Sequence, residues 1–130
     1  MGEVTSLAGR RVLVVEDEPL IAMLLEDMLS DLAVEAAHTA DSVPAALDAV
    51  ASLDGLDGAI LDMNLRGRSV DPVADALAEK GIPFVFASGY GQGAPGVGRH
   101  DGAPVLAKPF RKEALEEALL TVFAPLRADP

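Results

Sequence analysis

Five polar residues stand at the ends of apolar runs in this 130-residue chain: Glu16, Asp17, Asp62, Ser88 and Lys108. If the fold brought the three carboxylates together, their mutual repulsion would raise their pKa values unless a cation joined them. Mg²⁺ is a hard cation that keeps several waters and often takes only one or two carboxylates from a protein. Asp17 and Asp62 suit that role, so these residues predict a magnesium site.

Asp62 is also a candidate nucleophile. A carboxylate that is ionised at neutral pH can attack a phosphoryl group and form an acyl phosphate. Such a transfer requires the charge on the equatorial oxygens to be neutralised while the nucleophile and the leaving group stay in line. Mg²⁺, the Lys108 ammonium and the Ser88 hydroxyl could each hold one of these oxygens. The set therefore predicts phosphoryl transfer.

The apolar runs themselves have the composition of buried β-strands. Val12-Leu13-Val14-Val15 contains no polar residue, which indicates a strand covered on both faces. We expect five strands, at Arg11–Glu16, Val34–Thr39, Gly58–Asp62, Pro83–Ala87 and Pro104–Ala107.

Helical periodicity lies between these strands. Pro19 suits a first helical turn, and apolar residues recur after it with helical spacing, which predicts a helix to about Leu32. Its apolar density, including Met23 and Met28, favours core packing over a docking face. Three further helices are expected. One begins at a cap, Asp41 or Ser42, and the next runs near Asp71–Glu79. The last carries Leu115, Leu119 and Val122 on one face.

The alternation of strands and helices implies right-handed crossovers and a parallel sheet covered on both faces. In such sheets, ligands bind beyond the carboxyl ends of the strands, where the five polar residues stand. One segment departs from the pattern. Gly89–Gly102 contains six glycines and Pro95 at the place of the fourth helix, so we expect that helix to be short or irregular.

The motifs at the strand ends resemble those of receiver domains of two-component signalling. They are Val14-Val15-Glu16-Asp17-Glu18, Leu61-Asp62-Met63-Asn64, Ser88 and Lys108-Pro109-Phe110, and the match runs from about Arg11 to Val122. The resemblance implies an α/β, flavodoxin-like, doubly wound fold, with a five-stranded parallel sheet in the order 2-1-3-4-5.

The resemblance also implies roles for individual residues at a Mg²⁺ site. Asp17 would bind the metal directly and Glu16 mainly through water, with Asp62 and the backbone carbonyl of Asn64 as further ligands. Asp62 would be the phosphorylation site.

Two residues would then respond to the phosphoryl group. Ser88 would be the hydroxyl switch that moves to meet it, and Lys108 would be the cation that pairs with it. The Lys108–Pro109 peptide bond would be cis, as in that family.

A narrower resemblance lies in Pro83–Gly91, which is similar to the "FAT GUY" group of receivers, often single-domain regulators, with Ser88 in the threonine position. That group lacks the aromatic switch on the last strand, and Val105 stands at the matching position here. The segment Gly89–Gly102 would be the mobile element instead. Tyr90 is either a reporter of the switch or an ordinary loop residue.

The composition excludes several classes of function. A formal net charge of −11 would repel a phosphate backbone, so we expect no nucleic-acid binding. The chain has no cysteine and no apolar run near the ~20 residues of a membrane span, so we expect a cytoplasmic protein without membrane contact. His38 and His100 lack metal-ligand spacing with one another.

The expected organisation is an N-terminal extension (residues 1–10), a receiver domain (11–123) and a C-terminal tail (124–130). The resemblance implies a monomer that receives phosphate from a histidine kinase or histidine phosphotransferase, and an exposed part of the first helix could meet a kinase helix. It would signal in trans to an unknown downstream protein, or serve as a phosphate sink. Apart from its own phosphorylation and dephosphorylation it would not be an enzyme.

Two rival classes remain at this point. An aspartyl-phosphate phosphohydrolase uses the same acyl phosphate and Mg²⁺, but that family needs a second acid two residues beyond the nucleophile, where this chain has Asn64. A flavodoxin-like module for a nucleotide or flavin needs a phosphate loop, and Glu16-Asp17-Glu18 follows the first strand instead.

Overall fold

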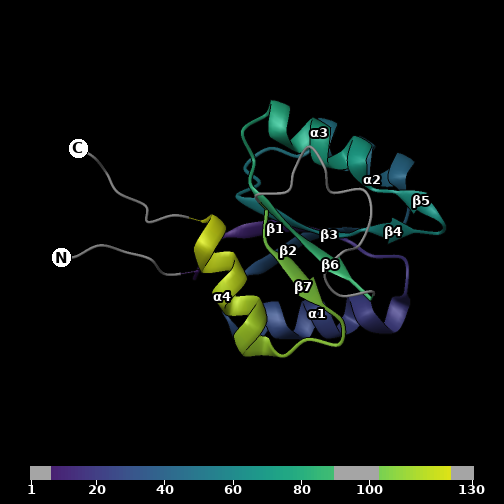
Figure 1. Cartoon of the computed structure of the whole chain (residues 1–130). Helices are drawn as coiled ribbons and strands as arrows, with labels where there is room; N and C mark the ends of the chain where they lie inside the picture. The colour runs from purple at the N-terminus through teal and green to yellow at the C-terminus, as the bar shows by residue number, and fades with distance from the viewer. Residues whose placement is uncertain (1–6, 90–102, 124–130) are drawn as a thin grey trace.

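The computed structural model describes residues 7–89 and 103–123, which form a parallel sheet between two layers of helices (Figure 1). The strands are β1 (Arg11–Val15), β2 (Glu35–Ala40), β3 (Gly58–Asp62), β4 (Asn64–Leu65), β5 (Arg68–Ser69), β6 (Phe84–Ser88) and β7 (Val105–Ala107). The helices are α1 (Pro19–Asp31), α2 (Val43–Ser52), α3 (Asp71–Glu79) and α4 (Lys112–Val122).

The main sheet has the order β2-β1-β3-β6-β7, and all of its neighbouring strands are parallel. These strands are the five that the sequence predicts, so the order 2-1-3-4-5 and the flavodoxin-like fold are confirmed. The predicted bounds were shifted by one residue for some strands: β1 ends at Val15, before Glu16, and β2 runs from Glu35 to Ala40.

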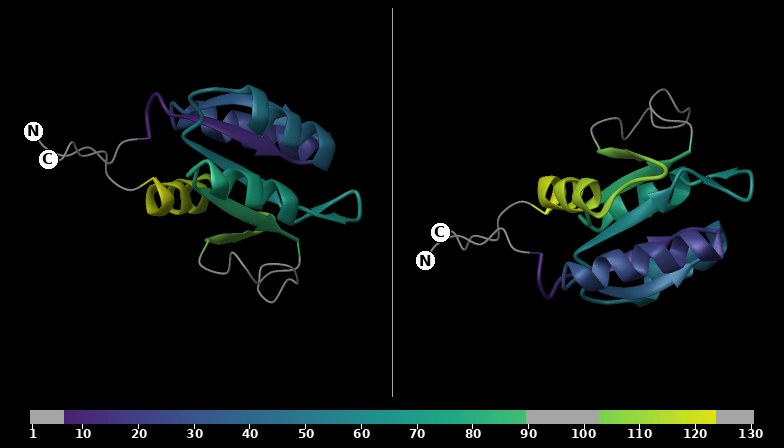
Figure 2. Two further views of the ribbon diagram at one scale, coloured as in Figure 1. Left: turned by 90° about the horizontal axis from the view of Figure 1, so that it is seen from above. Right: turned by 90° about the horizontal axis from the view of Figure 1, so that it is seen from below.

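Helices cover both faces of the sheet. Figure 1 shows α2 and α3 on one face and α1 and α4 on the other, and the views from above and below in Figure 2 look onto these two layers. Alternate residues of β1 point to opposite faces, as in any strand. Leu13 and Val15 join the core beneath α2 and α3, whereas Val12 and Val14 join the core beneath α1 and α4.

Local signals set the ends of the helices. Pro19 is the first residue of α1, and Ser42 caps α2, where its Oγ accepts a hydrogen bond from the Ala45 N–H at 3.2 Å. Of the two predicted caps, Ser42 is therefore the one used. None of the helices in the described residues could cross a membrane.

The segment after β3 contains an element that the sequence does not predict. It forms the antiparallel hairpin β4–β5, in which Asn64 pairs with Ser69 and Leu65 with Arg68. The turn residues Arg66 and Gly67 both have positive φ, 51° and 81°, as a two-residue type I′ turn requires. Leu65 is fully buried in the core beneath α2 and α3, and this burial fixes the hairpin to the domain.

Tyr90, His100 and most of Gly89–Gly102 lie outside the described residues. The expectations of a short fourth helix and a mobile element there stay predictions, as do the domain boundaries.

Candidate functional site

The site lies at the carboxyl ends of the central strands. Glu16 and Asp17 follow β1, Asp62 ends β3, Ser88 ends β6 and Lys108 follows β7. Because β1, β3, β6 and β7 are parallel neighbours, their ends meet at one edge of the sheet. An open depression of about 420 Å³ lies at this edge, and its lining includes Asp17, Asp62, Asn64 and Lys108.

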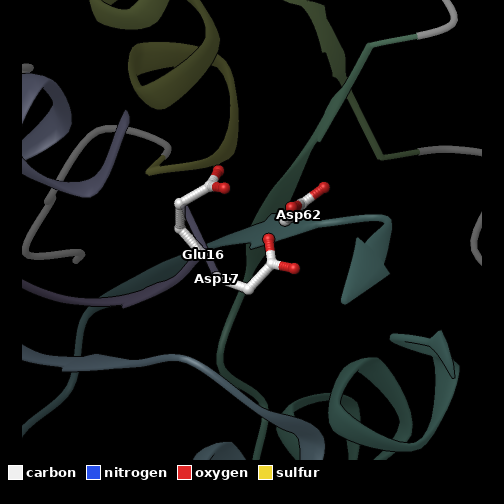
Figure 3. Close-up of side chains that lie close together, drawn as sticks. All are labelled: Glu16, Asp17 and Asp62. Carbon is white, nitrogen blue, oxygen red and sulfur yellow. The ribbon is translucent and has the colours of Figure 1, made fainter. Parts of the chain in front are cut away.

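Three carboxylates form a cluster. Glu16, Asp17 and Asp62 each offer an oxygen, and these oxygens lie within 4.8 Å of one another. Figure 3 shows the side chains reaching into the same space from the segment after β1 and from the end of β3. Glu16 is 2% exposed and Asp62 is 5% exposed, so two of the three charges lie in a poorly solvated position.

Backbone N–H groups hold each carboxylate in place. Glu16 Oε2 accepts from Glu18 N at 3.1 Å, Asp62 Oδ1 accepts from Asn64 N at 3.3 Å, and Asp17 Oδ2 accepts from Arg66 N at 2.9 Å. These bonds use one oxygen of each carboxylate. The second oxygens are available for a cation.

Lys108 supplies a cation at one side of the cluster. Its Nζ lies 2.9 Å from Glu16 Oε1 and 3.4 Å from Asp62 Oδ2. Burial works to lower the pKa of Lys108, but the interactions with Glu16 and Asp62 outweigh it and raise this pKa above its ordinary value. The side chain therefore stays an ammonium that two carboxylates share.

One ammonium does not neutralise the cluster. Burial, and then the charge of Glu16, raise the pKa of Asp62 from 3.8 to about 7, although Lys108 and the Asn64 N–H act in the opposite direction. Glu16 Oε1 is buried and accepts no hydrogen bond of good geometry within the described residues, so its contact with Lys108 is ionic. This region of the protein has an excess of negative charge.

These properties fit a hard divalent cation. The donors are oxygens, the carboxylates are close enough to share one ion, and the depression beside them leaves room for water ligands. Bound there, Mg²⁺ would oppose the effects of burial and of the Glu16 charge, which raise the pKa of Asp62. Asn64 is exposed and lines the same depression, and its predicted role as a backbone ligand stays a prediction.

Ser88 is placed differently from the other predicted residues. It ends β6 beside the Asp62 strand, but it is 1% exposed, and its neighbour Gly89 lines the depression instead. The backbone N–H of Lys108 donates to the Ser88 carbonyl at 2.8 Å, which joins the ends of β6 and β7. The Lys108–Pro109 peptide bond that follows is cis.

Arg66 is a residue of the site that the sequence did not single out. It lines the depression, and its backbone N–H donates to Asp17. The signal in the sequence is Gly67, a turn glycine two residues after the buried Leu65, which favours a tight hairpin that returns the chain to the site.

The interpretation of α1 as core packing needs correction. Leu20, Met23 and Leu24 are 72%, 57% and 52% exposed, because the wide apolar stripe of this helix extends beyond the face that the sheet covers. A small cavity of about 50 Å³ lies between the helix and the segment after β7, lined by Ile21, Leu24, Leu25, Met28, Lys108, Pro109 and Phe110. Lys108 therefore borders both this apolar surface and the acidic cluster.

Comparisons with known proteins agree with this geometry. The sequence profile of a family described as the response regulator receiver domain matches residues 12–120. The chain is 34% identical over 128 residues to the transcriptional regulatory protein TcrA of Mycobacterium tuberculosis, covering 94% of this chain and 46% of that protein. The chain thus spans about half the length of this relative.

Solved structures show the same similarity. The solution structure of SdrG from Sphingomonas melonis is 46% identical with a TM-score of 0.77, covering 92% of this chain and 99% of that one. A second SdrG structure, described as the BeF3-activated conformation, is 45% identical with a TM-score of 0.75, covering 93% and 100%. The receiver domain of PhyR from Erythrobacter litoralis is 30% identical with a TM-score of 0.75, covering 93% and 98%.

Proposed function

This chain belongs to the response regulator receiver domain family, and on that premise we propose that it accepts a phosphoryl group on Asp62 from a histidine kinase or histidine phosphotransferase. The proposal depends on one observation: the side chain of Asp62 lies close to those of Glu16, Asp17 and Lys108 at one edge of the sheet. It supplies a carboxylate nucleophile, ligands for a divalent cation, and an ammonium within 3.4 Å of the nucleophile.

The chemistry is an in-line displacement at phosphorus. A carboxylate oxygen of Asp62 forms a bond to phosphorus while the bond from phosphorus to the donor's nitrogen breaks, and the electron pair leaves with the donor imidazole. Mg²⁺ bound by the acidic cluster would neutralise charge on the transferring phosphoryl oxygens. The Asn64 N–H donates to Asp62 Oδ1 and so fixes the orientation of this carboxylate.

Lys108 is the residue that senses the product. Before transfer its ammonium is shared between Glu16 and Asp62, and the new phosphoryl group adds a charge of about −1.5 to −2 beside it. The ammonium is then drawn toward the phosphoryl oxygens. Because the Lys108 N–H is bonded to the Ser88 carbonyl, this pull acts on the ends of both β6 and β7.

Receiver domains interact with histidine kinases and with downstream proteins, and α1 is the surface on which we place the phosphodonor. Asp62 is 5% exposed, so a donor must come into contact with the rim of the depression to reach it. The exposed Leu20 and Leu24 lie two and six residues beyond Glu18, which lines the depression, and Lys108 borders both surfaces. An apolar helix of the donor fits this continuous surface.

The signal would leave through a change in protein contacts, with Ser88 as the hydroxyl that meets the phosphoryl group. Its burial supports a role in which a rearrangement brings the hydroxyl to the site. If the protein is a phosphate sink instead, the same transfer takes place without a downstream contact.

The test is incubation with acetyl phosphate and Mg²⁺, followed by the intact mass of the wild type, Asp62→Asn and Asp48→Asn. Asp48 is an exposed acid of α2 that is not among the residues lining the depression, and it serves as the matched control. We expect a phosphoryl adduct on the wild type and on Asp48→Asn but none on Asp62→Asn. An adduct that persists on Asp62→Asn would move the site elsewhere, and no adduct on the wild type would refute phosphoryl acceptance.

A further inference from the structure

Arg66 occupies a backbone conformation that an arginine rarely adopts. Its φ of 51° lies in the left-handed region, where a residue with a Cβ is less stable than glycine by roughly 1–2 kcal/mol. Glycine or asparagine is the usual residue at this position of a two-residue hairpin. We therefore expect the arginine side chain to make contacts that offset this cost.

The contacts of Arg66 join three loops at the site. Its backbone N–H donates to Asp17 Oδ2 at 2.9 Å, in the segment after β1. Its guanidinium donates twice to Asp41, in the segment after β2: Nε to the backbone oxygen at 3.0 Å, and Nη2 to Oδ2 at 3.3 Å. The turn of the β4–β5 hairpin is thus attached to the two loops beside it.

We propose that Arg66 is a positioning residue for the cation site: its guanidinium fixes the hairpin turn to Asp41, so that its N–H holds the Asp17 carboxylate in the orientation that binds Mg²⁺. This inference rests on the proposed function of the acidic cluster. Leu65 anchors one side of the turn in the core, and Asp41 anchors the other. Hydrogen bonds of this kind to metal ligands change metal affinity by roughly 10–100-fold in other proteins.

The direction in which Mg²⁺ affinity changes when the Arg66 side chain is lost distinguishes a positioning role from simple charge repulsion. A cation near a Mg²⁺ site repels the metal, so the loss of a positive charge by itself strengthens Mg²⁺ binding. If the guanidinium acts by positioning Asp17, its loss weakens binding instead. Arg68 offers the matched control, because it carries the same charge on the same exposed hairpin and no contact of its side chain with the site is seen in the described residues.

The experiment compares Arg66→Gly with Arg68→Ala and the wild type. Glycine keeps the N–H and relieves the positive φ, so Arg66→Gly removes the guanidinium contacts without adding backbone strain. The two side chains are exposed (57% for Arg66, 65% for Asp41), so the fold should survive. Mg²⁺ is titrated into ¹⁵N-labelled protein, and the amide shifts of Asp62 and Met63 give the half-saturating concentration.

We expect that concentration to rise about 3- to 10-fold in Arg66→Gly, and to stay equal or fall slightly in Arg68→Ala. Asp41→Ala removes the bond from Nη2 but keeps the bond from Nε to the Asp41 backbone oxygen, so it should weaken binding less than Arg66→Gly and should add little when combined with it. An unchanged or lower half-saturating concentration in Arg66→Gly overturns the proposal.

The rate of phosphorylation by acetyl phosphate provides an independent measurement. In Arg66→Gly the rate should be low at limiting Mg²⁺ and should recover at saturating Mg²⁺. If the rate stays low at saturating Mg²⁺ while Mg²⁺ binding is unchanged, the guanidinium binds the donor anion, and the positioning role is refuted. If Asp62 accepts no phosphate while the Mg²⁺ affinities still differ as expected, the proposed function fails and the role of Arg66 stands.

Discussion

The Nζ of Lys108 lies closer to Glu16 than to the candidate phosphoacceptor: 2.9 Å from Glu16 Oε1 and 3.4 Å from Asp62 Oδ2. Glu16 is 2% exposed, so water does not satisfy its carboxylate. In the unmodified protein, Lys108 therefore pairs with the buried Glu16 as well as with Asp62. A phosphoryl group on Asp62 must compete with Glu16 for this ammonium.

Removing Lys108 should destabilise the fold. Lys108→Ala leaves Glu16 and Asp62 buried without their cation, and we expect a loss of about 2 kcal/mol in the free energy of unfolding at pH 7 without metal, with part of it restored by Mg²⁺. Urea unfolding measures the loss. Lys112→Ala is the control, because its pair with Asp31 is exposed and should contribute less than about 0.5 kcal/mol. Equal losses in the two variants would show that the buried pairing is unimportant.

Asp62→Asn should stabilise the metal-free protein at neutral and alkaline pH. Burial and Glu16 raise the pKa of Asp62 from 3.8 to about 7 in the folded state. Between these values the folded state holds a proton that the unfolded state has released, so the stability of the wild type falls as the pH rises through this window. Asparagine removes the titration.

The difference between the two proteins isolates this carboxyl group. In EDTA at pH 8, we expect Asp62→Asn to exceed the wild type by roughly 1–3 kcal/mol in the free energy of unfolding, with the difference shrinking toward pH 4. Asp48→Asn should follow the wild type at each pH. A difference that is constant from pH 4 to pH 8 would contradict the raised pKa.

The Leu20→Asp variant tests the proposal that the phosphodonor contacts α1. Leu20→Asp places a charge on a side chain that is 72% exposed at the start of the helix, so the stability should change by less than about 0.5 kcal/mol. Transfer from the cognate kinase or phosphotransferase should slow roughly 10-fold, which is about 1.4 kcal/mol. Phosphorylation by acetyl phosphate should be unaffected, because this small donor needs no protein contact. Leu120→Asp, on α4, is the control for adding a charge at an exposed leucine.

Ser88→Ala separates acceptance of phosphate from the response to it. The variant should still gain an adduct on Asp62, because the carboxylates and Lys108 remain. With beryllofluoride and Mg²⁺, the amide shifts of Ala87 and Lys108 that the wild type shows should become smaller, because the hydroxyl no longer meets the phosphoryl analogue. Ser52→Ala, at an exposed position of α2, should respond like the wild type. Full-sized shifts in Ser88→Ala would exclude Ser88 as the switch.

The sequence alone determined the order of the five strands of the main sheet and the helices between them, and it predicted which residues form the site. Uninterrupted apolar runs such as Val12–Val15 indicate buried parallel strands, and four of the five predicted strands end on or beside a polar residue of the site. Strand ends meet at one edge of a parallel sheet, so convergence of Asp17, Asp62 and Lys108 follows from topology. These expectations depend on patterns within short segments.

Only the tertiary structure decided which partners the charged groups have. The sharing of Lys108 between Glu16 and Asp62 and the attachment of Arg66 to Asp17 and Asp41 join residues from separate loops. Periodicity does not encode such contacts, because their distances depend on how far each loop extends beyond its strand. The exposure of Leu20 was equally hidden: an apolar stripe indicates a face, but only the packed sheet determines how much of that face is covered.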